Sequence, residues 1–159
     1  MSPCTVISAH ASILIERPVE PVFAFVVLDF FANYRRWSPE IEHLEVLDPG
    51  PIRLGSAARQ VRVDHGRRTD TTFHVIALEP LQHLAFEELG KQRYRIRYAF
   101  EPVGGTADRA LQAAPHTLLN FACELKPLGL LLRPFEPLIR AAIQEGAEQA
   151  VRRIKGLVE

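Results

Sequence analysis

The chain has 159 residues, of which 47% are hydrophobic and 24% charged, and its 19 basic and 19 acidic side chains give a formal net charge of zero. This length fits one domain, residues 1–159, that buries roughly two-thirds of its unfolded surface in a single core. The balanced charge argues against a nucleic-acid partner, because proteins that bind nucleic acids usually carry a basic excess or a basic stripe.

The cysteines and the N-terminal stretch indicate the cellular setting. Cys4 and Cys123 do not make up the cysteine framework of a small secreted domain, so we expect a reduced, cytoplasmic protein. The chain does not begin with a basic segment followed by an apolar one, and no run approaches about 18 apolar residues. We therefore expect neither a signal peptide nor stable insertion into a membrane.

One strand and two short helices are predicted first. Hydrophobic residues alternate along Val6–Glu16, which is the pattern of a half-buried strand. Val19–Leu28 has helical spacing, and Pro21 is tolerated there because the first turn of a helix lacks acceptors for its amides. Asp29 is placed to cap a second helix that ends before Pro39. The apolar face of this second helix carries Phe30, Tyr34 and Trp37.

The hydrophobic period then changes to two, which predicts an antiparallel sheet. Turn signals separate the strands at short intervals, among them Asp64-His65-Gly66 and Glu79-Pro80-Leu81. Connections this short suit sequential hairpins, because parallel strands need long crossovers. The strands are predicted at Ile41–Leu47, Ser56–Asp64, Thr69–Leu78, His83–Leu89, Arg93–Glu101 and Thr106–Lys126, the last interrupted near Pro115.

Turns at Pro80-Leu81 and Gly90-Lys91-Gln92 predict a register for the central strands. Charged and apolar residues alternate along Arg93–Phe100, so a slip by one residue would bury arginines. Glu87 is expected to meet Arg95 on the outer face, as an exposed pair worth about 0.2 to 1 kcal/mol. The predicted inward rows are Phe73-Glu88-Tyr94, Val75-Phe86-Ile96 and Ala77-Leu84-Tyr98.

The last stretch, Leu138–Val158, is predicted to form one long amphipathic helix, around which the curved sheet wraps. A glycine inside a helix costs about 1 kcal/mol relative to alanine, so Gly146 indicates that space or close approach matters there. The large residues of the buried face, Ile139, Ile143, Val151, Ile154 and Leu157, are the predicted anchors. The small ones, Ala142, Gly146, Ala147 and Ala150, are predicted to roof a cavity.

Four motifs follow one another along the chain: Ile15–Phe23, Asn33–Glu40, Glu79-Pro80 and Tyr98–Thr106. Together with the order of elements, they resemble the helix-grip fold of the START-like (SRPBCC) superfamily, in its polyketide cyclase/dehydrase and lipid-transport group. The resemblance implies an α+β fold in which about seven antiparallel strands wrap around the C-terminal helix. It also implies a cavity between sheet and helix for an apolar or aromatic small molecule, whereas the motifs themselves mark a fold and not an activity.

Polar residues that the strand alternation directs to the concave side are the candidates for catalysis or ligand binding. Glu88 is expected to be desolvated, with a raised pKa that suits an acid or base; the alternative is a solvated strand end. Arg59 shares the parity of Val61 and is predicted to point to the concave side, where it would hold a carboxylate or an enolate-like oxygen, unless it too ends in solvent. Tyr94 and Tyr98 are either core residues with satisfied hydroxyls or face the cavity.

Neither a metal nor another cofactor is expected. The six histidines are scattered without an HExxH motif or a cysteine pair, and no phosphate-binding loop occurs. Trp37 is assigned either to the core or to the rim of the cavity. The predicted ligand-binding set is Trp37, Arg59, Phe73, Phe86, Glu88, Tyr94, Tyr98, Phe121, Ile143 and Gly146, with Glu88 and Arg59 as the catalytic candidates.

Three functions are weighed. The first is binding of a small hydrophobic molecule by a monomer or homodimer. The second is a cyclase or dehydratase, in which Glu88 shuttles a proton and Arg59 with a tyrosine hydroxyl stabilises an enolate. The third is an adaptor that contacts a partner or a membrane through the apolar patch of Leu128–Leu132 and Phe135. Otherwise this patch is expected to pack under the first turn of the last helix.

Overall fold

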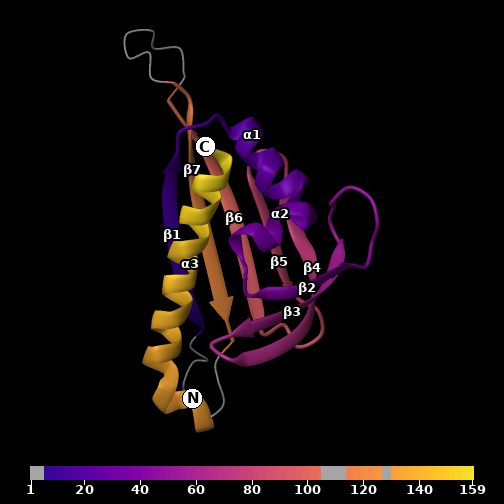
Figure 1. Ribbon diagram of the computed structural model, residues 1–159, viewed down its shortest axis with the longest axis vertical. Coiled ribbons are helices and arrows are strands. Elements are labelled where there is room, and N and C mark those ends of the chain that lie inside the picture. Colours follow the sequence, from indigo (N-terminus) through magenta and orange to yellow (C-terminus); the bar gives the residue numbers. More distant parts are fainter. Residues whose placement is uncertain (1–5, 105–113, 127–129) are drawn as a thin grey trace.

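A curved antiparallel sheet of seven strands, in the order β1-β7-β6-β5-β4-β3-β2, dominates the fold (Figure 1). The protein was analysed as a computed structural model, which describes residues 6–104, 114–126 and 130–159. The fold is α+β, as predicted. The strands are β1 (Ile7–Ile15), β2 (Ile41–Val46), β3 (Ala57–Asp64), β4 (Arg67–Glu79), β5 (His83–Glu88), β6 (Tyr94–Val103) and β7 (His116–Leu125).

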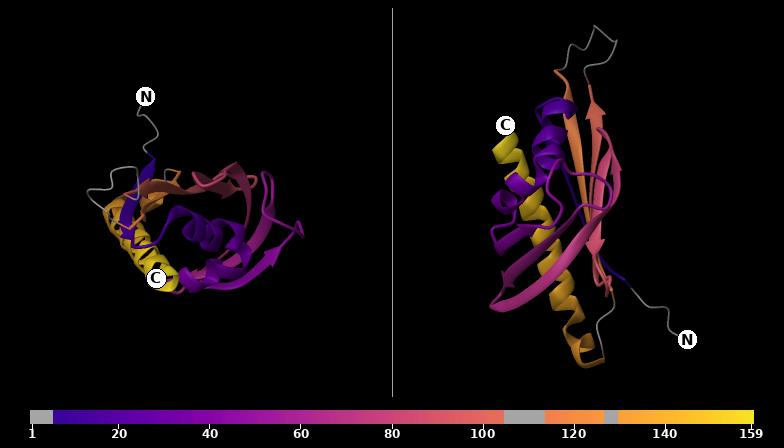
Figure 2. Two further views of the ribbon diagram at one scale, coloured as in Figure 1. Left: turned by 90° about the horizontal axis from the view of Figure 1, so that it is seen from above. Right: turned by 90° about the vertical axis from the view of Figure 1, so that its right-hand side faces the viewer.

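Two short helical segments follow β1 and lie inside the curve of the sheet (Figure 2). The first consists of α1 (Val19–Phe23) continued by the π-helical turn η1 (Ala24–Leu28), and the second is α2 (Phe30–Trp37). Asp29 stands at the N-cap of α2 as predicted, although its side chain makes no capping hydrogen bond. Both segments turn apolar faces to the sheet, which is why their aromatic residues belong to the core.

The C-terminal helix α3 (Glu136–Val158) runs along β1 on the concave side of the sheet (Figure 1). The short 3-10 helix η2 (Leu130–Phe135) leads into it. The second half of α3 is anchored by Ala147, Ala150, Val151 and Ile154, all buried. The prediction that Gly146 belongs to the buried face is wrong, because this residue is exposed. Ile143, one turn earlier, is only half-buried.

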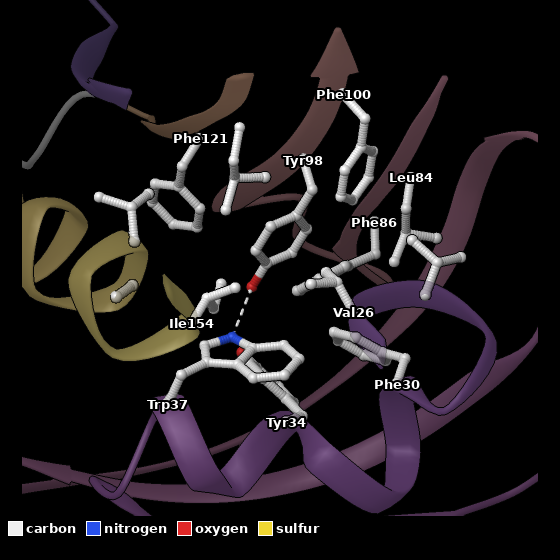
Figure 3. Packing of buried hydrophobic residues seen from close by; sticks show 14 of the residues in the cluster. Val26, Phe30, Tyr34, Trp37, Leu84, Phe86, Tyr98, Phe100, Phe121 and Ile154 are labelled. Atoms are coloured by element: carbon white, nitrogen blue, oxygen red, sulfur yellow. Dashed lines mark hydrogen bonds between the residues drawn. The ribbon is translucent and has the colours of Figure 1, made fainter. Parts of the chain in front are cut away.

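The core is rich in aromatic rings, which α2 contributes from one side and the sheet from the other (Figure 3). Phe30 of α2 stacks on Tyr34 with a centroid distance of 4.6 Å, and Phe73 and Phe86 lie 4.5 Å apart on neighbouring strands. Offset or edge-on ring pairs of this kind add to the stabilisation that comes from buried area.

The register of the central strands largely follows the prediction. Phe73 pairs with Glu88, Val75 with Phe86, Phe86 with Ile96, and Leu84 with Tyr98. The predicted pairing of Ala77 with Leu84 is wrong, because an irregularity between Val75 and Ala77 shifts the register, so that Leu78 faces Leu84 instead. The expected pairing of Glu88 with Tyr94 lies beyond the last paired residues of β5 and β6, Glu87 and Arg95.

The ion pair of Glu87 and Arg95 on the outer face is less exposed to solvent than expected. The two side chains meet at 3.1 Å as predicted, but the Glu87 side chain is 11% exposed and that of Arg95 55%. Glu87 is therefore covered by its neighbours, among them Gln92 and His74.

Three predictions fall partly outside the described residues. The last strand was expected from Thr106, whereas β7 is described from His116, and residues 105–113 are not described. Cys4 and Leu128 also lie outside the described residues.

One end of the molecule presents an apolar tip, which we define as Leu131, Leu132, Phe135 and Leu138. Leu131 is 90% exposed, Leu138 72% and Phe135 54%. The expectation that the patch of Leu128–Leu132 and Phe135 packs under the first turn of α3 is therefore wrong for its described side chains, Leu131, Leu132 and Phe135. No helix among the described residues combines the length and the apolar character needed to cross a bilayer.

Candidate functional site

The concave face has a packed end and an open end. At the packed end, Phe30, Trp37 and Tyr98 are at most 1% exposed, and Figure 3 shows their rings filling the space between α2, α3 and the sheet. At the open end the concave residues are only half-buried. Because paired residues share a face, the register places Thr71, Tyr94, Ile96 and Cys123 there.

The hydroxyl of Tyr94 is the centre of a polar cluster at the open end. It lies 2.8 Å from Thr71 Oγ1 and accepts a hydrogen bond of 3.2 Å from Gln60 Nε2. Gln60 and Thr71 face each other on β3 and β4, so three strands contribute to this cluster. Burial raises the pKa of Tyr94, and its phenol is therefore protonated at neutral pH.

Two buried polar atoms beside this cluster have no hydrogen-bond partner among the described residues. They are Gln60 Oε1 and the hydroxyl of Tyr34, whose residues are 2% and 1% exposed. A buried polar group without a partner costs about 1 to 3 kcal/mol, so such groups are uncommon in native proteins. Burial also raises the pKa of Tyr34 and keeps its hydroxyl neutral, although the neighbouring Arg62 guanidinium comes close enough to the hydroxyl to oppose this shift in part.

Arg62 is the cation on the same face of β3 as Gln60. Its guanidinium makes two hydrogen bonds of 3.1 Å to Asp64 and lies 4.0 Å from Glu40. With two carboxylates around it, this charge is largely compensated within the protein.

The aromatic residues of the predicted ligand-binding set lie deeper, at the packed end. Trp37 Nε1 donates a hydrogen bond of 3.1 Å to the Tyr98 hydroxyl, drawn in Figure 3, so both polar groups are satisfied inside the core. Phe73 and Phe86 are fully buried beside them, and Phe121 packs edge-on against Tyr98 at 5.2 Å. A role for these five residues in ligand binding stays a prediction.

Glu88 is buried, with 3% exposure, but the expected raised pKa is wrong. Its carboxylate accepts hydrogen bonds from the backbone N–H of Arg93 at 3.0 Å and from Arg93 Nε at 2.8 Å. The side-chain hydrogen bonds of Arg93 outweigh the effect of burial and lower the pKa of Glu88. Glu88 thus holds the turn between β5 and β6, and its charge is already compensated.

Arg59 lies on the convex face, so the prediction that it points to the concave side is wrong. Phe73 is on the concave face and pairs with Ala58, so Ala58 is on that face too. Arg59 is the next residue along the strand and pairs with Thr72, and both therefore lie on the opposite, convex face. Its guanidinium binds both carboxylate oxygens of Asp70, at 2.9 and 2.6 Å, which lowers the pKa of Asp70. Arg59 and Glu88 are therefore not brought together.

Among the described residues, a hollow lies on the outside between β1 and the first turns of α3. This groove has a volume of ≈ 640 Å³ and is lined in part by Ser8, Arg133 and Gln144. It lies on the outer side of β1, because Ser8 has the opposite parity to the buried residues Ile7 and Ala9. No cluster of three potential metal ligands occurs within the described parts of the chain.

Comparison with known proteins places this geometry among solved structures of the same fold. The Zhui aromatase/cyclase from Streptomyces sp. R1128 is similar, with a TM-score of 0.74, 14% identity and coverage of 97% of this chain and 94% of that one. Norcoclaurine synthase from Thalictrum flavum gives a TM-score of 0.71 at 12% identity, covering 99% and 96%. A START superfamily protein from Mycobacterium smegmatis gives 0.70 at 16% identity, covering 95% and 96%.

A comparison with curated protein sequences found no match. At these identities the structural similarities establish the fold alone. The sequence comparison goes further, because a family described as "Polyketide cyclase / dehydrase and lipid transport" matches residues 6–159, which is nearly the whole chain. The chain therefore belongs to the polyketide cyclase/dehydrase and lipid-transport family, and it shares the fold of the similar solved structures.

Proposed function

We propose that the protein binds a small, largely apolar molecule between the open end of the concave face and the first half of α3. The observation that carries this proposal is the polar cluster around the Tyr94 hydroxyl, which lies among concave residues that are only half-buried. Ligand sites typically combine apolar walls with a few such polar groups that fix orientation.

The apolar walls come from half-buried residues on both sides. Ile96 and Cys123 pair with each other on β6 and β7, and Ile143 lies on α3. Gly146 follows Ile143 by three residues on α3 and is exposed, and a Cβ atom there would meet no described atom within 4 Å. The lining residues proposed here are Thr71, Tyr94, Ile96, Cys123, Ile143 and Gly146.

The similar structures support an aromatic ligand. One of them is norcoclaurine synthase in complex with dopamine and hydroxybenzaldehyde, and another is an aromatase/cyclase. Binding is favoured over catalysis for this chain, because Glu88 is paired with Arg93 and Arg59 faces the convex side. These are the two residues on which the cyclase hypothesis depended.

Gly146 offers a test with a matched control on the same helix. The neutral dye N-phenyl-1-naphthylamine serves as the probe, and its fluorescence reports binding. Gly146→Leu should weaken dye binding because the new side chain fills space at the open end. Gly156→Leu makes the same change at an exposed site beside the packed end, where a Cβ also meets no described atom within 4 Å.

Both substitutions remove a helical glycine, so both are expected to raise the free energy of unfolding by up to about 1 kcal/mol. A loss of dye binding in Gly146→Leu alone supports the proposed site. Absence of dye binding to the unmodified protein, or equal effects of the two variants, would contradict the proposal. Turnover of a polyketone by the unmodified protein would instead favour an enzyme.

The apolar tip supports a second candidate, docking to an anionic membrane surface. Leu131, Phe135 and Leu138 project at one end of the molecule, with exposed Arg133 among them. Lys126 lies at the end of β7 and bonds to the backbone of Lys91, which places two more cations at this end. Apolar side chains among cations match an anionic bilayer, whose headgroups attract lysine and arginine.

Sedimentation with vesicles tests this docking. The protein should bind vesicles of phosphatidylcholine with phosphatidylglycerol more strongly than phosphatidylcholine alone, and Leu131→Asp should abolish the binding. Leu54→Asp is the control, because Leu54 is also well exposed (66%) but lies in the connection between β2 and β3. Equal vesicle binding by the two variants would contradict docking to a membrane. Docking would also be contradicted if the protein bound no vesicles but self-associated in a way that Leu131→Asp removes.

A further inference from the structure

The groove on the outer side of β1 lies beside the first turns of α3 (Figure 1). Its volume of ≈ 640 Å³ falls within the range of about 300 to 1,000 Å³ that is typical of small-molecule sites. Ser8 of β1 and Arg133 of η2 line it from two sides. One row of α3 with a spacing of four residues completes the polar lining, namely Glu136, Arg140 and Gln144.

Hydrogen-bond donors outnumber acceptors in this groove. Arg133 makes no hydrogen bond or ion pair with any residue that the structure describes, so its five N–H donors are held by solvent alone. Arg140 donates to Glu136 at 2.9 Å and has further N–H groups to offer. The hydroxyl of Ser8 adds another donor. A ligand with several acceptor oxygens therefore suits the groove.

The lining also carries a net charge of +1, because two arginines face one glutamate. On the neighbouring strand, Glu124 pairs with Ser8 and has Arg95 on its other side, so these two charges offset each other. A singly charged anion matches this balance. The arginine fork binds phosphate oxygens through two parallel hydrogen bonds, and a phosphodiester carries one negative charge.

The groove is continuous with the apolar tip. Arg133 lines the groove and also lies between Leu131 and Phe135 in η2. Arg140 follows Leu138, the last residue of the tip, by two residues, which is about 3 Å along the helix axis. Apolar side chains at a membrane surface are buried about 5 to 10 Å into the boundary between headgroups and acyl chains. With the tip inserted in this way, the groove opens at the level of the lipid phosphates.

From these observations we infer that the groove binds the phosphodiester headgroup of one anionic phospholipid while the tip holds the protein on the bilayer. The phosphate oxygens accept hydrogen bonds from Arg133, Arg140 and the hydroxyl of Ser8, and the acyl chains stay in the bilayer beside the tip. This inference rests on the second candidate function, docking to a membrane, since it names the lipid group that is recognised there.

Dihexanoylphosphatidylglycerol separates headgroup binding from docking, because this short-chain lipid stays monomeric below its micelle-forming concentration and offers the headgroup without a bilayer. Isothermal titration should show that the unmodified protein binds it and that Arg140→Gln binds it about three-fold or more weakly. Arg152→Gln is the matched control and should bind as the unmodified protein does. Arg152 also pairs with a glutamate four residues earlier on α3, Glu148, but outside the groove.

Glu136→Gln should change the affinity in the opposite direction. The substitution releases Arg140 from its carboxylate partner and makes the groove more positive, so the short-chain lipid should bind about two-fold or more tightly. Glu145→Gln removes the same charge from an exposed position of α3 that does not line the groove, and should leave the affinity unchanged.

The outcomes distinguish the inference from docking itself. Equal effects of Arg140→Gln and Arg152→Gln, or vesicle binding by a protein that does not bind the short-chain lipid, would overturn the inference and leave docking intact. Failure to bind both vesicles and the short-chain lipid would contradict both. Displacement of the lipid by an equal concentration of inorganic phosphate would reveal a plain anion site, and the assignment to a lipid headgroup would be wrong.

Discussion

At the scale of single residues, Glu88 shows how a buried carboxylate can be structural and not catalytic. It faces the concave side by register, yet Arg93 in the following turn supplies both a backbone and a side-chain hydrogen bond. Gln92, with φ of 52°, and Gly90, with φ of 92°, give that turn the left-handed conformations that bring Arg93 back to Glu88. Alternation predicted the burial of Glu88 but carried no information about this partner.

Glu88→Gln should therefore destabilise the protein in a pH-dependent way. The pKa of Glu88 is lowered on folding, so its contribution is fully present above the unfolded pKa, about 4.3, and is lost as pH falls through the folded pKa. At neutral pH we expect a loss of about 1 to 2 kcal/mol, because Arg93 is half exposed. Urea titrations of both proteins at pH 7 and pH 3 measure this, and the difference between them should shrink at pH 3.

Asp70→Asn is the matched control for this prediction. Its carboxylate also binds an arginine through two hydrogen bonds, but on the exposed convex face. Solvent and salt screen that pair, so a much smaller change is expected. If the two variants lose the same free energy of unfolding, the burial of Glu88 adds nothing to the stability that its pair with Arg93 provides.

The faces on which Arg59 and Gln60 lie can be predicted from the turn that follows their strand. The turn His65-Gly66 joins β3 directly to β4, and both residues have positive φ, 50° and 82°. A two-residue loop of this kind fixes the register, with Gln60 opposite Thr71 and Arg59 on the other face. The shift beyond Val75 could not be predicted in the same way, because an irregularity inside a strand leaves no turn residue to mark it.

At the scale of elements, α3 closes the free edge of the sheet as well as covering the core. β1 is an edge strand, and its outward backbone groups bond to side chains of the last helix and the C-terminal residue. Gln144 bonds both the N–H and the C=O of His10, at 3.2 and 2.7 Å. Lys155 donates to the C=O of Leu14, and Glu159 accepts from the N–H of Glu16. Unprotected edges of this kind are templates for association between chains.

Gln144→Ala should thus expose a segment of this edge. We expect the free energy of unfolding to fall by about 0.5 to 1.5 kcal/mol and self-association to increase, as measured by urea titration and light scattering. Gln149→Ala is the control, because Gln149 bonds only Glu145 and Arg153 of its own helix among the described contacts. Equal association of both variants would show that Gln144 does not protect the edge.

The elements themselves were largely predictable from periodicity. The first strand, the two short helices and the long helix occur close to the predicted bounds, and so do the strands from β2 to β6. What periodicity could not give is how deeply each turn of α3 is buried. Ile143 and Ile154 were both predicted for the buried face, yet one is half-buried and the other fully buried, because burial depends on which strands lie opposite.

At the scale of the whole molecule, stability and binding are expected to reside at different ends. Phe30 is fully buried at the packed end and contacts the rings of Tyr34, Phe73, Phe86 and Tyr98 among others. Ile143 is half-buried at the open end. Truncation of a side chain in a packed core leaves a cavity, and the surrounding atoms lose contacts that nothing replaces. A side chain at a partly open site makes fewer contacts, so its truncation costs less free energy.

This division predicts opposite outcomes for two truncations. Phe30→Ala should cost about 3 to 5 kcal/mol of unfolding free energy, yet the molecules that remain folded should bind N-phenyl-1-naphthylamine with nearly unchanged affinity. Ile143→Ala should cost clearly less than the roughly 2 to 5 kcal/mol of a fully buried isoleucine, but should weaken dye binding. Urea titration and dye fluorescence on the same samples measure both quantities. If Ile143→Ala is as destabilising as Phe30→Ala, the open end is ordinary core, because only a closely packed isoleucine loses that many contacts.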